Sequence, residues 1–349
     1  MEAKQFILPA VAVVLLIVAG IIALITVTSK KARKFAEPEV ATIAISPESA
    51  RRALSQYHIK SSYNSCASGD YQNDYVTLAA LSNAMKNGCR LLDFEIYDSE
   101  EEPIVAVSTS KEYTFKGSYN SIPLAEVLKR VKTEAFTVSN GRDPLFLQFR
   151  IKSDHVGICT KTATLLKDNF GDVLLPNQYN YQFGGKNIGS IPLKAFIGKV
   201  FIIVDMTNPV VAKSSLAEFV NLGANTSFNR VMSIQELAHN APADILDYSA
   251  QYMLTCTPEL DTAANYDSSV GFNQGAQIIA MKFQRQDGNL DLYNKNFNGY
   301  AFLLKAKDLQ HVETVVEEAP DLPEKYNYGS ILSEVKAGSE NPFTFEIAK

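Results

Sequence analysis

Short apolar runs that alternate with amphipathic stretches limit the folds open to this chain. Strand-like composition marks four runs, at residues 90–98, 145–151, 199–205 and 276–284. Apolar side chains recur at three- and four-residue spacing in the stretches between them, which predicts helices at 78–88, 123–136 and 159–171. Alternating strands and helices build βαβ units, so the pattern predicts an α/β fold with a mainly parallel sheet.

Composition narrows the class of protein further. The chain has 349 residues, of which 46% are hydrophobic, and a net charge of −5. This length suits one α/β barrel, which typically takes roughly 250 residues, and a mildly acidic chain without a basic tract predicts no nucleic-acid partner. The four cysteines form no CxxC pair, which indicates free thiols in a reducing compartment rather than a metal site or disulfides: Cys66, Cys89, Cys159 and Cys256.

One segment near the N-terminus predicts a membrane anchor. Phe6–Val27 is a run of 22 residues without a charged side chain. At about 1.5 Å per residue such a helix spans the roughly 30 Å of hydrocarbon in a bilayer. The basic residues Lys30, Lys31, Arg33 and Lys34 follow the run, which by the positive-inside rule places the rest of the chain on the cytosolic side. A buried core helix is the alternative interpretation.

The sequence therefore predicts five parts. These are a short N-terminus (1–5), a transmembrane helix (6–27), a basic juxtamembrane linker (28–46), a folded α/β part (47–306) and an acidic C-terminal tail (307–349).

Six motifs in order resemble those of the eukaryotic-type phosphatidylinositol-specific phospholipases C. They are IKSSYNS (59–65), MKNGCRLLDFEIYD (85–98), EEPIVAVST (101–109), PLFLQFRI (144–151), GAQIIAMKFQ (275–284) and NFNGYAFLLKA (296–306). The resemblance implies that family's distorted TIM (β/α)₈ barrel over Tyr57–Ala306. It also implies that the two halves of the barrel join across a short gap around Asn208–Asn229.

The family's reaction uses two histidines for proton transfer, and both positions differ here. The first is Tyr63 and the second is Val107. A phenol with a pKa of about 10 is a poor proton shuttle at neutral pH, and a valine cannot transfer protons. His58 lies near Tyr63, but its odd offset of five residues predicts that it points to the opposite face of the strand.

The family's calcium site is altered as well. Asn64 matches the asparagine ligand, and Asp93 and Glu95 match the two acidic ligands with the acids exchanged. The fourth ligand position is Arg150, whose guanidinium offers no oxygen to calcium. We therefore predict that Arg150 pairs with Asp93 or Glu95 and that the chain has lost calcium and needs no cofactor.

The positions that would contact the substrate also lack the family's residue types. Ile203 and Asp205 replace the lysines that bind phosphate, and His239 and Ala241 replace an arginine and a tyrosine that contact inositol. A phosphorylated headgroup needs cationic partners, so these replacements predict that the site no longer recognises it.

Two functions remain open from the sequence. The first is a catalytically inactive, membrane-anchored barrel that acts as a structural or protein-binding module, for example between a virion membrane and its capsid. The alternative is an active phosphodiesterase with a rewired site that uses Tyr63, Asn64, Asp93 and Glu95.

Overall fold

The structure is a computed structural model, and it describes residues 3–31, 33–38, 40–110, 112, 115–311, 331–335 and 343–347. The chain divides into two compact units, Met1–His311 and Val312–Lys349. In the second unit the described residues form an antiparallel pair of strands, β12 (Ile331–Val335) and β13 (Phe343–Ile347). The first unit carries the predicted α/β part.

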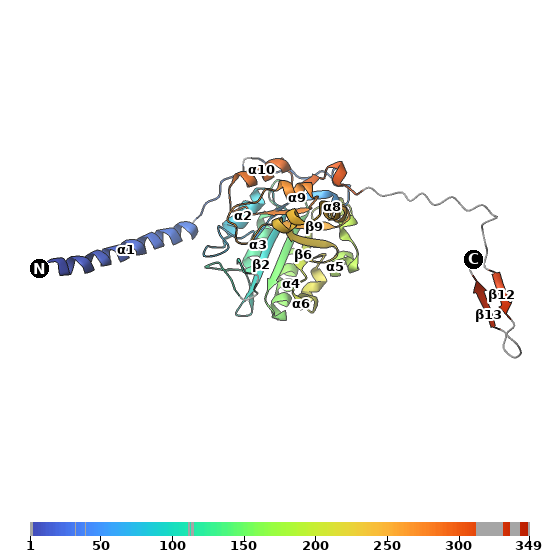
Figure 1. Cartoon of the computed structure of the whole chain (residues 1–349), viewed down its shortest axis with the longest axis horizontal. Helices are drawn as coiled ribbons and strands as arrows, with labels where there is room; N and C mark the ends of the chain where they lie inside the picture. Colours follow the sequence, from blue (N-terminus) through green and yellow to red (C-terminus); the bar gives the residue numbers. More distant parts are fainter. Residues whose placement is uncertain are drawn as a thin grey trace. The chain divides into compact units, whose positions relative to one another are not determined.

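Eight parallel strands form the centre of the first unit (Figure 1). In chain order they are β1 (Tyr57–Ser62), β2 (Leu91–Ser99), β5 (Leu145–Lys152), β6 (Val200–Asp205), β7 (Leu222–Ala224), β8 (Asn229–Ser233), β9 (Met253–Thr257) and β10 (Ile278–Met281). They pair in the order β7-β6-β5-β2-β1-β10-β9-β8. Between the two end strands of this order, β7 and β8, Thr226 in the turn forms an isolated antiparallel bridge with Asn229. The sheet is thus a nearly closed parallel barrel with helices around it, as the sequence predicted.

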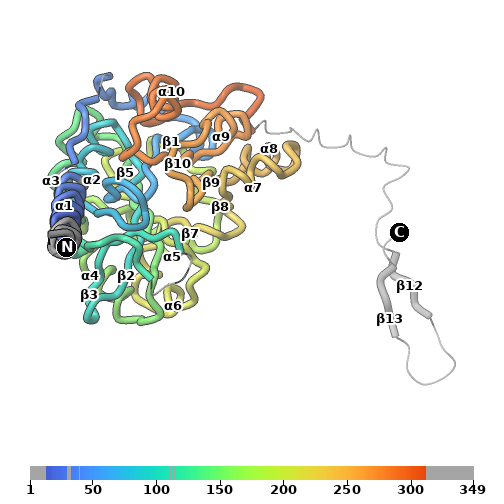
Figure 2. The backbone as a smooth tube through the Cα atoms, turned by 60° about the vertical axis from the view of Figure 1, so that its left-hand side comes forward, coloured from blue at the N-terminus to red at the C-terminus, as the bar shows by residue number. Residues whose placement is uncertain are grey.

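Helices connect most successive barrel strands along the chain, as parallel pairing requires, and α10 follows the last barrel strand (Figure 2). They are α2 (Leu78–Lys86), α3 (Leu124–Glu134), α4 (Val156–Phe170), α5 (Asn180–Gly185), α6 (Pro209–Ala212), α7 (Ile234–His239), α8 (Pro242–Gln251), α9 (Ser269–Asn273) and α10 (Gly288–Phe297). Three short strands pair antiparallel at the sheet: β3 (Glu102–Ala106) with β2, β4 (Ile122–Pro123) with β3, and β11 (Phe302–Leu304) with β1.

The interpretation of residues 208–229 as a gap between the halves of the barrel was wrong. This segment carries α6, the 3₁₀ turn η5 (Ser215–Phe219) and the barrel strand β7. β7 is only three residues long, and its sequence Leu-Gly-Ala gives too short a pattern to mark a strand.

The N-terminal segment is the helix α1 (Ala3–Lys31), which includes the whole predicted span Phe6–Val27. Within the described part of the chain, no helix reaches the length and apolarity that mark a membrane crossing. The linker that follows contacts the barrel: Glu37 pairs with Lys86 at 2.7 Å, and the Ile43 N–H donates to the Gly299 carbonyl at 2.9 Å.

The two faces of each barrel strand bury different side chains. On β2 and β5, Leu91 and Phe146 pack inside the barrel, whereas Leu92, Phe94 and Leu147 pack in the cluster beneath the helices. Because side chains alternate along a strand, the residues that follow Leu91 and Phe146 at even spacing also face inward. The polar residues at these positions of β2 and β5 therefore point into the barrel, near the carboxyl ends of these strands.

Candidate functional site at the barrel mouth

Arg150 lies at the carboxyl end of the barrel, where ligands bind in barrels of this architecture. The parallel register of β2 and β5 places it directly beside Glu95, with Asp93 one inward position below. Its Nη1 donates to Glu95 Oε1 at 2.7 Å, and its Nε and Nη2 donate to the two oxygens of Asp93 at 3.1 and 2.7 Å. The sequence predicted a pair with Asp93 or Glu95, and the structure shows both.

Asn64 completes the contacts of the guanidinium. Its Oδ1 accepts a hydrogen bond from Arg150 Nη2 at 2.7 Å, and its backbone N–H donates to Asp93 Oδ2 at 3.0 Å. The backbone at Asn64 has a φ of 47°, a left-handed conformation that asparagine tolerates better than most residues. Because of this turn after β1, both the side chain and the backbone N–H of Asn64 contact the cluster of Arg150 and Asp93. The four sequence positions Asn64, Asp93, Glu95 and Arg150 therefore form one site.

Burial makes these contacts strong. The carboxylates of Asp93 and Glu95 are each 1% exposed, and the Arg150 side chain is 14% exposed. Burial alone would lower the pKa of Arg150, but the charges of Asp93 and Glu95 and the nearby Tyr63 hold that pKa well above its ordinary value. Arg150 is therefore a permanent cation between two buried carboxylates.

Tyr63 stacks on the guanidinium rather than lying ready for proton transfer. The Arg150 Cζ lies 4.4 Å from the centroid of the Tyr63 ring, which is the geometry of a cation–π contact. Burial raises the pKa of the Tyr63 phenol well above its ordinary value. The phenol thus stays protonated throughout the neutral range and cannot accept a proton as a neutral imidazole does.

The second histidine position of the family holds a buried apolar side chain. Val107 is 1% exposed and packs in the hydrophobic cluster beneath the helices. Its neighbour Ser108 uses its backbone N–H to donate to Glu95 Oε2 at 3.1 Å, and Tyr97 donates its hydroxyl to the same oxygen at 2.8 Å. These contacts satisfy the outer oxygen of Glu95, and the motifs did not indicate Ser108 or Tyr97 as part of the site. Tyr97 follows Glu95 at a spacing of two, which was a usable signal.

The four histidines lie away from this cluster. His58 faces outward from β1, as predicted: its Nδ1 lies 2.7 Å from the Ala276 carbonyl, and burial lowers its pKa to about 4. His155 is exposed and lies 2.5 Å from Asp98. His239 is exposed at the end of α7, and His311 follows the last barrel segment. None of the described residues that line the barrel mouth is a histidine.

A cavity of about 620 Å³ opens above Arg150. Its floor is formed by Tyr63, Glu95 and Arg150, and its charged wall residues are Lys152, Asp205, Glu236 and Glu259. Among these residues, the acids outnumber the two cations, and one of those cations is already bonded to Asp93 and Glu95. The cavity therefore presents a net negative field to a ligand.

The predicted substrate positions lie in different places. Asp205 lines the cavity, and its Oδ1 accepts from the Thr207 N–H and from Asn225 Nδ2, both at 3.0 Å. Ile203 is fully buried inside the barrel below it. His239 and Ala241 lie between α7 and α8 and do not belong to the described lining of the cavity.

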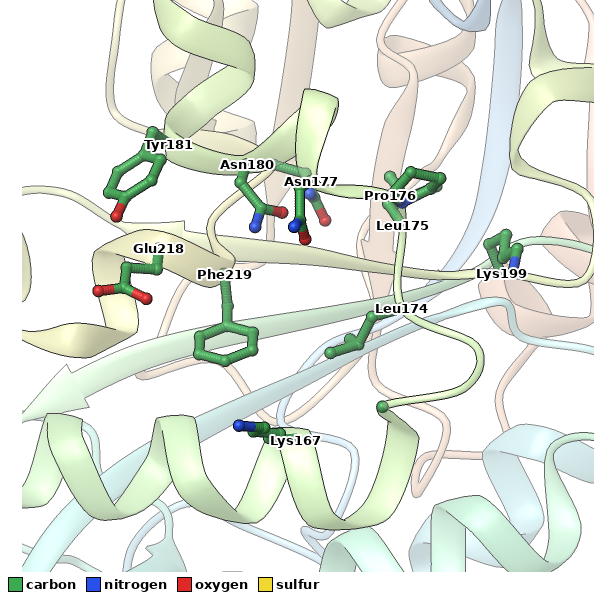
Figure 3. Close-up of a pocket in the computed structure, with 12 residues that line it drawn as sticks. Lys167, Leu174, Leu175, Pro176, Asn177, Asn180, Tyr181, Lys199, Glu218 and Phe219 are labelled. Atoms are coloured by element: carbon green, nitrogen blue, oxygen red, sulfur yellow. The ribbon is translucent and has the colours of Figure 1, made fainter.

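A second cavity of about 730 Å³ lies on the flank of the barrel (Figure 3). Its charged residues come from separate elements: Lys167 from α4, Lys199 before β6 and Glu218 from η5. Its polar residue Asn221 has a structural role, because its side chain accepts from the Ile202 N–H and donates to the Tyr179 carbonyl. No residue of the Arg150 cluster lines this cavity, so the barrel mouth is the stronger candidate site.

Comparison with known proteins identifies the fold. A family model described as the phosphatidylinositol-specific phospholipase C, X domain, matches residues 50–204. The structure resembles S. officinalis PLC21 with a TM-score of 0.63 and L. pealei PLC21 with a TM-score of 0.61, each at 20% sequence identity over 76% of this chain. It also resembles a calcium-dependent phosphoinositol-specific phospholipase C from Pseudomonas sp. with a TM-score of 0.50, at 12% identity over 77% of this chain and 100% of that one.

The chain spans only 38% of the length of the two PLC21 proteins. The likeness to all three structures is below 25% identity and therefore concerns the fold. Together with the match to the X domain, it shows that this chain has the barrel of the phosphatidylinositol-specific phospholipases C.

Proposed function

We propose that this chain is a catalytically inactive, membrane-tethered barrel of the phospholipase C type that acts as a structural or protein-binding module. The observation that carries the proposal is the position of Arg150. Its guanidinium bonds at once to Asn64, Asp93 and Glu95, the residues that match the family's metal ligands.

The charge balance of this cluster favours the loss of calcium. Calcium takes six to eight oxygen ligands, typically about 2.3–2.6 Å away. The oxygens of Asn64, Asp93 and Glu95 that face the centre of the site are already taken by the guanidinium, and a divalent ion beside it would meet a like charge. Arg150 thus supplies the positive charge that the two buried carboxylates require.

Proton transfer lacks suitable groups as well. Well-placed acid and base groups each contribute roughly 10²–10⁴ to a rate, and they work best with a pKa near the working pH. Tyr63 has a raised pKa and stacks on Arg150, and Val107 is an aliphatic side chain in the core. Neither can replace a histidine in the reaction of the family.

The walls of the cavity weigh against a phosphoinositide substrate. Phosphate groups bind where arginine and lysine side chains or backbone N–H groups converge. Here Asp205, Glu236 and Glu259 face the cavity, and Lys152 is the one lysine among its described lining residues. A headgroup with several phosphates would be repelled rather than held.

We further propose that the helix α1 tethers the barrel to a bilayer. The uncharged run Phe6–Val27 and the basic cluster after it support a single-pass anchor with the barrel on the cytosolic side. A catalytically inactive barrel on such an anchor is suited to join a membrane to an outer protein layer. A virion with an internal membrane beneath its capsid is the setting that we propose, and capsid proteins are the proposed partners.

A phosphodiesterase assay tests the inactive state. The full chain is incubated with phosphatidylinositol vesicles, with and without calcium, and release of inositol phosphate is measured. We expect no release above that of a heat-denatured sample. Turnover that the Asp93→Asn variant abolishes would overturn the proposal and establish the rewired phosphodiesterase instead.

Particle composition tests the proposed setting. Quantitative mass spectrometry of purified membrane-containing virions should find the chain in a fixed ratio to the capsid proteins. Its presence in membranes of uninfected cells and its absence from such particles would contradict this part of the proposal.

A further inference from the structure

Lys60 is a buried lysine on the outer face of β1. It lies between Ile59, which packs inside the barrel, and Ser61, so its side chain points outward. The residue is 4% exposed, and the elements around it are α2, α10 and the linker before the barrel. α10 is fixed to β1 by Tyr293, whose hydroxyl accepts from the Ser61 N–H at 2.8 Å.

The ammonium of Lys60 makes no hydrogen bond or ion pair with any residue that the structure describes, although its backbone N–H and carbonyl are both bonded. The titratable group whose charge acts on it is Cys89, just before β2, and Glu37 from the linker and Asp291 and Lys295 from α10 line the same cavity. Glu37 is paired with Lys86 of α2. Burial lowers the pKa of Lys60 to about 8, with the neighbouring Cys89 acting in the opposite direction.

Lys60 lines a cavity of about 460 Å³. The polar side of this cavity is rich in amides and contains Asn87, Gln286, Asn294 and Asn298. The Oδ1 of Asn294 is buried and has no hydrogen-bond partner among the described residues. The apolar side is formed by Ala36, Pro38, Val40, Leu290 and Leu292. A buried cation thus lies beside an aliphatic wall, and the nearby Asn294 Oδ1 is an acceptor that lacks a donor.

We propose that this cavity binds a small carboxylate with a short aliphatic tail, with the carboxylate on the Lys60 ammonium and the tail on the aliphatic wall. The proposal does not depend on the proposed function, because the cavity shares no lining residue with the barrel mouth.

The size and charge of the cavity select this class of ligand. Ligand sites are mostly apolar with a few placed polar groups, which matches the two sides of this cavity. One buried lysine balances a single negative charge, whereas a phosphate dianion would also meet Asp291 and would lack an arginine fork. An unpaired buried ammonium is a cost to the fold, and a bound carboxylate offsets that cost.

Calorimetric titration of the full chain with sodium hexanoate tests the proposal. We expect saturable binding at about pH 7 with a dissociation constant in the millimolar range, and binding of hexanol at least about tenfold weaker. Lys60→Met should weaken hexanoate binding at least about tenfold, whereas Lys295→Met, at the exposed rim of the same cavity, should change it less than about twofold.

Two further measurements keep the test decisive. Thermal unfolding should show that Lys60→Met is at least as stable as the wild type, because the variant removes a buried charge without a partner. In the wild-type chain, hexanoate affinity should fall as the pH rises through about 8, because the ammonium is then lost. The proposal would be overturned if hexanoate showed no saturable binding, or if Lys60→Met bound hexanoate as well as the wild type does. It would also be overturned if the wild type bound hexanol as well as hexanoate, or if its hexanoate affinity stayed constant across this pH range.

Discussion

Arg150 shows how one residue type sets the chemistry of a group of oxygens at the mouth of a barrel. β2 and β5 still bring the inward positions 93, 95 and 150 together, as the parallel register requires. A guanidinium at position 150 turns this group of oxygens into an ion-pair cluster that is closed by Asn64. The centre of the cluster is therefore occupied by the protein's own cation.

Removal of Arg150 should be costly. Arg150→Met leaves Asp93 and Glu95 buried side by side without a counter-charge, which we expect to lower the free energy of unfolding by about 3–5 kcal/mol. Chemical denaturation of the full chain measures this loss. The triple variant Arg150→Met, Asp93→Asn, Glu95→Gln should recover much of it, because the buried charges are gone. A loss below about 1 kcal/mol in the single variant would show that the cluster is not held by these ion pairs.

Lys305 gives a prediction about pH. It is 2% exposed, its Nζ donates to the Ser249 carbonyl at 2.8 Å, and burial lowers its pKa to about 7. The unfolded chain keeps a lysine pKa near 10.5, so between about pH 7 and 10 the unfolded state binds more protons than the native state. The buried charge of Lys305 therefore lowers the free energy of unfolding most below about pH 7, and this destabilisation decreases as the pH rises.

The Lys305→Met variant isolates this effect from the other titrating groups. We expect the stability of the wild type to rise relative to the variant between about pH 7 and 10, as followed by denaturation at a series of pH values. The Ser249 carbonyl keeps a donor in the variant, because Gln277 Nε2 also bonds to it at 2.7 Å. A difference that is constant with pH would contradict the assigned burial of the charge.

At the scale of elements, Arg90 joins the start of β2 to the segment between α3 and β5. It is fully buried, and it donates to the carbonyls of Ala135 and Asp143 at 2.7 Å and of Pro144 at 3.3 Å. Asp143 in turn accepts from the Ile45 N–H at 2.8 Å, so the linker is held at the same place. The Arg90 side chain thus satisfies three backbone carbonyls in the connection between α3 and β5.

Arg90→Met should destabilise the barrel by about 3 kcal/mol or more, because each buried carbonyl left without a donor costs about 1–3 kcal/mol. Arg130→Met on α3 is the matched control. Arg130 is 40% exposed and pairs with Glu134 at 2.6 Å, and such a surface pair contributes less than about 1 kcal/mol. Thermal unfolding compares the two variants, and equal losses would refute the structural role of Arg90.

Most of the fold could be predicted because its signals are local. The strands at 91–99, 145–152 and 200–205 and the helices at 78–86, 124–134 and 156–170 agree with the predicted segments to within a few residues. The strand runs did not include β1, β7, β8 or β9, which are all short, and β7 has only three residues, too few to show a period. The motifs indicated Asn64, Asp93, Glu95 and Arg150, and the two-residue spacing on β2 could have indicated Tyr97. The contact of Ser108 with Glu95 depends on how β3 folds back on β2, and such a contact has no signature in the order of residues.

At the scale of the whole molecule, the barrel with its closed ion-pair site follows a helix that we propose as a membrane anchor. α1 covers the uncharged run Phe6–Val27, and the described side chains of its later part, including Leu16 and Ile17, are exposed. An apolar helix surface of this kind needs a bilayer or a protein partner to cover it.

Flotation of the expressed chain on a sucrose gradient tests the anchor. The wild type should float with membranes and resist extraction by alkaline carbonate. Leu16→Arg should shift a large share of the chain to the soluble fraction, because a charge at the centre of a span costs about 2.5–3.5 kcal/mol, whereas Ser29→Arg at its end should not. A wild-type chain that stays soluble would contradict the anchor and favour a helix covered by protein.

A calorimetric titration with calcium tests the central claim most directly, that the Arg150 guanidinium holds the position of a divalent ion. The full wild-type chain should give no saturable heat at millimolar calcium, whereas Arg150→Glu, which supplies oxygens in place of the guanidinium, should bind the ion and gain stability from it. Stoichiometric binding to the wild type that Asp93→Asn abolishes would contradict the claim.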